Sequence, residues 1–203
     1  MVPPPGPPSA APQLSHSAGV PAPVQPSLHD DLLKDLPALP DLDSFSPQIA
    51  AWVRMRGAGL ARGGEIPDAD DMPAYLTSRA GSLLKGDPNE DLLAILLMLE
   101  AVKSAKDDLI KKMTEKLREI NGTKTRLRGE NPGYQLPVAP TKADLDAMLE
   151  LLKKQEDEMS GMGEMESLKL QTAMVRLSKL MSTLSNLLKK ASKTEEDIVG
   201  NIK

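Results

Sequence analysis

The two histidines are the residues of this chain best suited to hold a metal ion or to transfer a proton near neutral pH. His16 lies in a proline-rich segment, and His29 is followed by Asp30 and Asp31. Adjacent residues on a helix point in different directions, and the sequence offers no further ligand near this trio. We therefore interpret His29 as a solvated residue and predict neither a metal site nor a cofactor.

Carboxylates are plentiful, with 29 Asp and Glu residues in a chain of 203. The sequence places none of them in an evident apolar pocket that would raise its pKa. It also has no glycine-rich phosphate loop after a strand, and no cysteine for thiolate chemistry. These features favour a protein that is not an enzyme.

A basic stretch, residues 111–128, raises the question of nucleic-acid binding. It lacks aromatic residues for base stacking, and its bases alternate with apolar residues at helical spacing, so a solvated helix face explains it better. The net charge of -4 gives no reason to expect nucleic acid. The longest apolar run, Leu92 to Leu99, ends after eight residues. A membrane span needs roughly 18, so we predict none.

The elements that must position the side chains are helices, and the C-terminal one has the strongest pattern. Its seven-residue apolar repeat comprises Leu170, Leu177, Leu184, Ala191 and Ile198. Neighbouring positions on the same side hold Met174, Leu180, Met181, Leu187 and Leu188. No acidic residue occurs between Ser167 and Thr194, where six bases do. Such a helix needs a partner in its own chain, in a second copy or in another protein.

A second long helix is predicted from Pro88 to about Arg128, capped by Asp87 and bent or ended at Asn121-Gly122. Its apolar stripe consists of Leu92, Leu96, Leu99, Val102, Leu109, Met113, Leu117 and Ile120. Because the stretches 88–128 and 164–200 have similar lengths, we expect an antiparallel pair. The run Leu92 to Leu99 is apolar nearly all round, which indicates a second covering layer from a partner or further subunits.

The segment between the long helices, residues 129–162, is predicted to form a mobile head. Prolines interrupt helix at its beginning, and Thr141 begins a short helix with Asp144 as its capping partner. Acidic residues within 142–166 are expected near the basic end 111–128. Gly161 and Gly163 mark either a hinge or a weak point in a continuous helix.

The N-terminal part divides into a tail and a region of short helices. Residues 1–27 are rich in proline and lack aromatic residues, so we predict a disordered tail. Within 28–86 we predict three short helices, joined by glycine-rich linkers: one between Ser27 and Pro37, one from Ser46-Pro47 to Gly57, and one from Asp68 to Leu84. The fold class is all-α: a coiled-coil-type antiparallel hairpin over 87–203, with a small irregular or helical head and a disordered tail.

Two runs of the sequence carry a family resemblance: DLLAILLMLEAVKSAKDDLIKKMTEKL and LQTAMVRLSKLMSTLSNLLKKASKTEEDIVGNIK. Together they resemble bacterial type III secretion filament and needle-tip proteins of the EspA and SseB kind, over residues 88–203. The resemblance implies a secreted virulence protein at the bacterial cell surface, cytoplasmic before export, that self-assembles through its coiled-coil helices. Its implied partners are copies of itself, a secretion chaperone, and needle or translocator proteins, with residues 1–27 as a secretion signal.

A different class of function fits the same helices. An intracellular coiled-coil adaptor or scaffold would also present a long helical hairpin with apolar seams. The two classes differ in how far association continues, because an adaptor stops at dimers or tetramers whereas a filament subunit does not.

Overall fold

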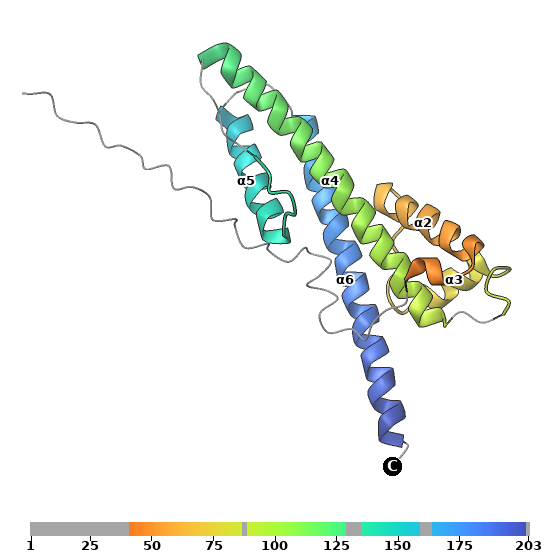
Figure 1. Cartoon of the computed structure of the whole chain (residues 1–203). Coiled ribbons are helices and arrows are strands. Elements are labelled where there is room, and N and C mark those ends of the chain that lie inside the picture. Colours follow the sequence, from red (N-terminus) through yellow and green to blue (C-terminus); the bar gives the residue numbers. More distant parts are fainter. Residues whose placement is uncertain (1–40, 87–88, 129–134, 159–163, 202–203) are drawn as a thin grey trace, which may run out of the picture.

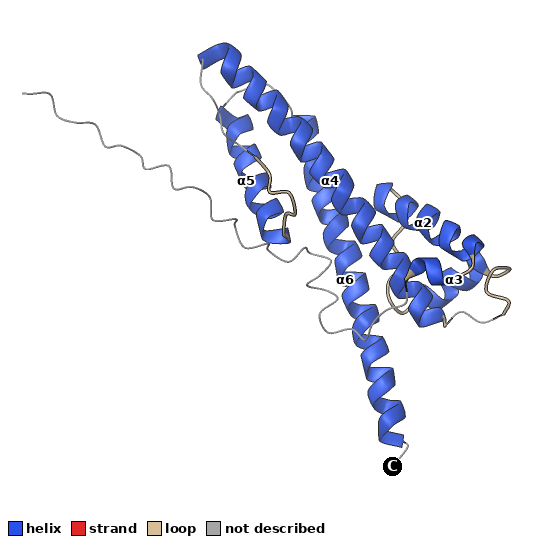
Figure 2. Cartoon of the chain, viewed as in Figure 1, coloured by secondary structure: helices blue, strands red, loops and turns tan. Residues whose placement is uncertain are grey.

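The computed structural model describes residues 41–86, 89–128, 135–158 and 164–201. In these residues the protein is all-helical and contains no strand, as predicted (Figure 2). Its elements are the 3-10 helix η1 (Leu42–Ser44) and the α-helices α2 (Pro47–Arg62), α3 (Met72–Ala80), α4 (Glu90–Arg128), α5 (Lys142–Glu158) and α6 (Glu164–Asn201). The predicted tail, 1–27, and the predicted helix before Pro37 lie outside the described residues.

The long helices α4 and α6 pack side by side as the predicted antiparallel hairpin (Figure 1). The antiparallel direction is seen in Figure 1, and the contact between Lys116 towards the end of α4 and Glu166 at the beginning of α6 agrees with it. The apolar stripes of both helices belong to one continuous buried core. The C-terminal helix therefore finds a partner within its own chain.

The helices α2 and α3 form a second layer over the first part of α4 (Figure 1). Every side chain from Leu93 to Leu99 is buried, and so are Val53 of α2 and Met72 and Leu76 of α3. The second layer predicted from the all-round apolar run is thus present, but the chain itself supplies it. An additional subunit is not needed to cover this part of α4.

The beginning of α2 matches the prediction, but its end does not. The Ser46 hydroxyl accepts a hydrogen bond from the Ile49 amide at 3.4 Å, and Pro47 occupies the first turn. The predicted end at Gly57 is wrong, because α2 continues to Arg62. At Gly57 a Cβ would stand 3.0 Å from the Cβ of Glu100, so this glycine allows α2 to approach α4 closely.

The helix α3 is shorter than the predicted span from Asp68 to Leu84. Before it, the Asp71 amide bonds to the Asp68 carbonyl oxygen in a separate turn, and Pro73 sets the first helical turn. After it, the amides of Leu83 and Leu84 both bond to the Ala80 carbonyl oxygen. Local turns at both ends therefore replace helix that the sequence pattern predicted.

The helix α4 begins two residues later than predicted and ends at Arg128, as predicted. Asn89 caps it, with the side-chain oxygen accepting bonds from the amides of Asp91 and Leu92 at 3.1 and 3.3 Å. The predicted cap, Asp87, lies outside the described residues. The helix neither stops nor breaks at Asn121-Gly122, because it continues to its last residue at 128.

The segment between the long helices contains α5, which packs against both of them. Thr141 and Asp144 form the predicted capping pair, with the Thr141 amide 2.9 Å from the carboxylate and the Asp144 amide 3.2 Å from the hydroxyl. The Thr141 hydroxyl also lowers the pKa of the Asp144 carboxyl. Leu145 and Leu152 are fully buried in the common core, so α5 packs as a third helix. The predicted mobility of the head stays a prediction.

The connection from α5 to α6 settles only part of the question about the hinge. These are two separate helices, since α5 ends at Glu158 and α6 begins at Glu164. The two glycines themselves, Gly161 and Gly163, lie outside the described residues.

Candidate interaction surfaces

Most residues of the predicted seam meet in the interior of the hairpin. The buried ones are Leu96, Leu99, Val102, Leu109, Met113, Leu117 and Ile120 of α4, and Leu170, Met174, Leu177, Leu180, Leu184 and Leu187 of α6. Those packed at the edge of the core are Leu92, Met181, Leu188 and Ala191. The side chain of Ile198 lies outside the described part. The role of this seam in self-assembly stays a prediction, because the structure buries it within one chain.

The predicted stripe omitted residues on the other faces of α4. The structure also buries Leu93, Ala94, Ile95, Leu97, Met98, Ala101 and Ala105. In the sequence, most of them lie in the run Leu92 to Leu99, which is apolar on all sides of the helix and so does not form one stripe. These residues belong to the same core as Val53 and Trp52 of α2. They are the part of the core that joins the N-terminal helices to the hairpin.

A buried lysine joins the end of α4 to the beginning of α6. The Lys116 side chain is only 5% exposed, and its Nζ lies 2.7 Å from a carboxylate oxygen of Glu166 and 3.6 Å from one of Glu119. The hydrogen bond and the charge of Lys116 lower the pKa of the Glu166 carboxyl. This pair confirms the predicted proximity of an acidic residue of 142–166 to the basic end of α4. Its charges are matched, so we assign it a structural role.

A second polar contact joins α6 to the end of α2. The Arg176 guanidinium donates to the Leu60 carbonyl oxygen from Nε at 2.8 Å and from Nη2 at 2.6 Å, and it also donates to the Gly64 carbonyl oxygen. Carbonyl groups at a helix end lack partners within the helix and attract cations. Arg176 thus completes the end of α2. No spacing rule could have predicted this contact, since more than a hundred positions separate the partners.

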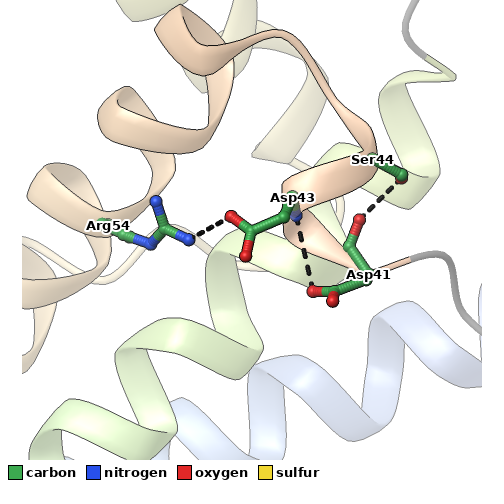
Figure 3. A network of polar contacts seen from close by, with 4 residues as sticks. All are labelled: Asp41, Asp43, Ser44 and Arg54. Carbon is green, nitrogen blue, oxygen red and sulfur yellow. Dashed lines mark hydrogen bonds and ion pairs between the residues drawn. The ribbon is translucent and has the colours of Figure 1, made fainter.

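Residues 41–44, the first that the structure describes, are joined to α2 by the polar network of Figure 3. Asp41 caps η1, accepting a bond from the Asp43 amide through its carboxylate and another from the Ser44 hydroxyl through its carbonyl oxygen. Asp43 in turn forms an ion pair with Arg54 of α2. This network places Asp41 and Leu42 at the edge of a groove on α4.

The groove has a volume of about 560 Å³. Its floor is one side of α4, and its two walls come from residues 41–42 and from residues 138–140. The side chain of Val138 is fully exposed at one wall. The walls and floor are largely apolar, so this groove is a candidate binding surface for a helix or an extended peptide.

A second candidate surface is the outward side of α6. Leu168 and Val175 lie there, 61% and 70% exposed, and their separation of seven residues aligns them along the helix. Between Ser167 and Thr194, α6 carries basic but no acidic residues. This outer side of α6 therefore combines exposed apolar contacts with positive charge.

Two kinds of function find no site in the described part of the chain. Its Asp and Glu residues form no group of three that would hold a metal ion, and none of its helices has the length and apolar character to cross a membrane. The trio beginning at His29 lies outside the described residues. No protein-family model matches the chain, and the comparisons with curated proteins and with solved structures find no match.

Proposed function

We propose that this protein is a secreted structural subunit that self-assembles through its long helices into a type III secretion filament or needle-tip extension. The observation that carries the proposal is the outer side of α6, where Leu168 and Val175 remain exposed although the inner stripe is already buried. Aligned apolar side chains at helical spacing favour contact with another helix. Assembly then adds copies without opening the hairpin.

The length of α6 supports the same proposal. Because Lys116 pairs with Glu166 in an antiparallel hairpin, Glu90, 26 residues before Lys116, lies opposite residue 192, 26 residues after Glu166. The last nine residues, 193–201, extend past the beginning of α4 (Figure 1). This projection measures about 13 Å at a rise of about 1.5 Å per residue. A projecting helix end offers the next copy a place to pack.

The resemblance to filament and needle-tip subunits supplies the biological setting of this proposal. In that setting the protein is held by a chaperone in the bacterial cytoplasm and is then exported to the cell surface. It assembles there with copies of itself and contacts needle or translocator proteins. A chaperone would cover the outer side of α6 before export, since exposed apolar stripes promote premature association.

Electron microscopy of the purified protein at rising concentration tests the proposal. We expect elongated assemblies to grow with concentration, and a double variant, Leu168→Ser with Val175→Ser, to abolish them without changing helical circular dichroism. Met55→Ser is the matched control, because Met55 is also 61% exposed but lies on α2. Particles that never exceed dimers or tetramers, or a double variant that assembles normally, would contradict a filament role.

The second candidate is an intracellular coiled-coil adaptor or scaffold. It is favoured by the burial of the predicted seam inside a single chain, which leaves a stable hairpin without any copy of itself. The same microscopy separates the two functions, because an adaptor forms only small, finite particles at every concentration.

A further inference from the structure

The groove on α4 is an apolar surface that no described helix fills. The buried side chains Leu96, Leu99 and Val102 form the bottom of its floor, and the half-buried Ile110 belongs to the same floor. Residues 96–110 of α4 give it a length of about 21 Å at about 1.5 Å per residue. An open apolar surface of this shape is stabilised by an occupant that brings its own apolar stripe.

The position of the groove points to the part of the chain that precedes it. Asp41, the first described residue, itself lines the groove. Forty residues precede it in the sequence. A segment attached directly at the edge of a surface is present there at an effective concentration in the millimolar range, so weak contacts are enough to dock it.

The thirteen residues immediately before Asp41, LHDDLLKDLPALP, have the pattern that the groove requires. In the helix predicted to stop before Pro37, Leu28, Leu32 and Leu36 are spaced four residues apart and fall on one side. Nine helical residues span about 13 Å, and the next four residues, extended, span a similar distance. Together they reach along the whole groove.

The charges are also compatible. Lys103 and Lys106 line the groove, and neither has an ion-pair partner among the described residues. The polar side of the segment carries Asp30, Asp31 and Asp35 against one lysine. Two acids, Glu100 and Asp107, share the groove with the lysines, so the apolar stripe supplies most of the attraction and the charges set its orientation.

We propose that residues 28–40 dock in the groove formed by α4, residues 41–42 and residues 138–140, with Leu28, Leu32 and Leu36 on the apolar floor. In this arrangement the segment joins the N-terminal helices to the loop before α5, and it keeps the groove from binding other helices. The inference stands apart from the proposed assembly, which uses the outer side of α6.

The absence of cysteine from the sequence allows a direct test with single introduced thiols. Ile110→Cys reports on the groove, and Met55→Cys, on the exposed side of α2, is the matched control. Each cysteine is introduced into three chains. These are the full chain, a chain lacking residues 2–27, and a full-length chain that carries both Leu32→Asp and Leu36→Asp. The measurement is the rate of modification by a water-soluble disulfide reagent.

We expect the Ile110→Cys thiol to react roughly tenfold faster in the Asp double variant than in the full chain, since docking then protects it about nine-tenths of the time. Removal of residues 2–27 should leave that rate unchanged, and the Met55→Cys thiol should react equally in all three chains. Val138→Cys repeats the test from the wall formed by residues 138–140 if Ile110→Cys does not fold.

Three outcomes would overturn the inference. Equal groove rates in all three chains would mean that the segment does not dock. Faster reaction after removal of residues 2–27 would assign the groove to the proline-rich tail. Protection that disappears on dilution would assign it to a second copy of the chain.

Discussion

In the first half of α4 every side chain from Leu93 to Leu99 is buried, whereas in the second half buried and exposed side chains alternate at helical spacing. The difference appears at matching positions 14 residues apart on the same face. Leu97 is fully buried, and its counterpart Lys111 is exposed. Ala101 is fully buried as well, and its counterpart Glu115 is exposed.

The comparison shows how a sequence records the number of layers around a helix. Where α2 and α3 lie opposite α6, apolar residues occupy all sides of α4, and where α6 and α5 lie along one side, charged residues take the rest. An all-round apolar run therefore indicates a further layer of helices that covers this helix, and it does not indicate greater helix stability. In this chain the layer is intramolecular.

The largest expected effect comes from exchanging the residue types of a buried position in the first half and its exposed counterpart in the second half. Leu97→Lys places an ammonium group in a fully buried site, and it should cost about 4 kcal/mol or more of unfolding free energy. The reciprocal change, Lys111→Leu, should stay within about 0.5 kcal/mol because that site is exposed. Urea denaturation followed by circular dichroism measures both. Similar effects of the two changes would show that the halves do not differ as described.

An intermediate effect is expected where α2 touches the first half of α4. Gly57→Ala puts a methyl group 3.0 Å from the Glu100 side chain and 3.1 Å from the Ala101 amide nitrogen. The displacement of α2 should outweigh the better helix propensity and cost about 1–3 kcal/mol. Gly59→Ala is the matched control on the same helix, since its methyl group meets nothing within 4 Å. It should gain up to about 1 kcal/mol. Thermal unfolding midpoints should therefore move in opposite directions, and a common direction would refute the close contact.

The smallest effect is expected in the second half, at the half-exposed carboxylate of Glu166. Glu166→Gln should cost about 1 kcal/mol or less at neutral pH, given the solvent screening. The pKa of Glu166 is lowered in the folded protein, so the charged carboxylate contributes fully above its ordinary pKa. That contribution disappears as the pH falls through the lowered value.

Denaturation at neutral pH and near pH 3 tests this dependence, because the gap between the wild type and Glu166→Gln should narrow in acid. Glu115→Gln, at an exposed position near the same lysine, should differ little from the wild type at neutral pH. A gap that stays constant with pH would mean that the Lys116 pair does not stabilise the hairpin.

Sequence patterns were sufficient for those parts of the fold that repeat along a helix. The stripes containing Leu109 and Leu177, the antiparallel pairing and the cap at Thr141 follow from local periodicity and local hydrogen bonding. The end of α2 did not follow, because glycine is both a helix breaker and a site of close packing. Only the distance to Glu100 distinguishes the two roles.

The candidate surfaces were harder to predict than the fold. The exposure of Leu168 and Val175 depends on which side of α6 the rest of the chain covers, and the pattern of apolar residues does not decide this. The groove depends on Asp41 and Val138, which lie far apart in the sequence and meet only through the packing around α4. Such features arise from tertiary structure, and single-sequence periodicity does not contain them.

The bond between Arg176 and the end of α2 has a consequence for the order in which the chain is made. The ribosome completes α2 first, but the arginine that satisfies the Leu60 carbonyl oxygen is added 116 residues later. At about 5–20 residues per second, α2 waits roughly 6–23 s for this partner. Until α6 is made, the apolar faces of α4 that it covers remain exposed. The nascent chain is thus most accessible to binding partners before its last helix is synthesised. Any factor that holds it unfolded must bind within those seconds.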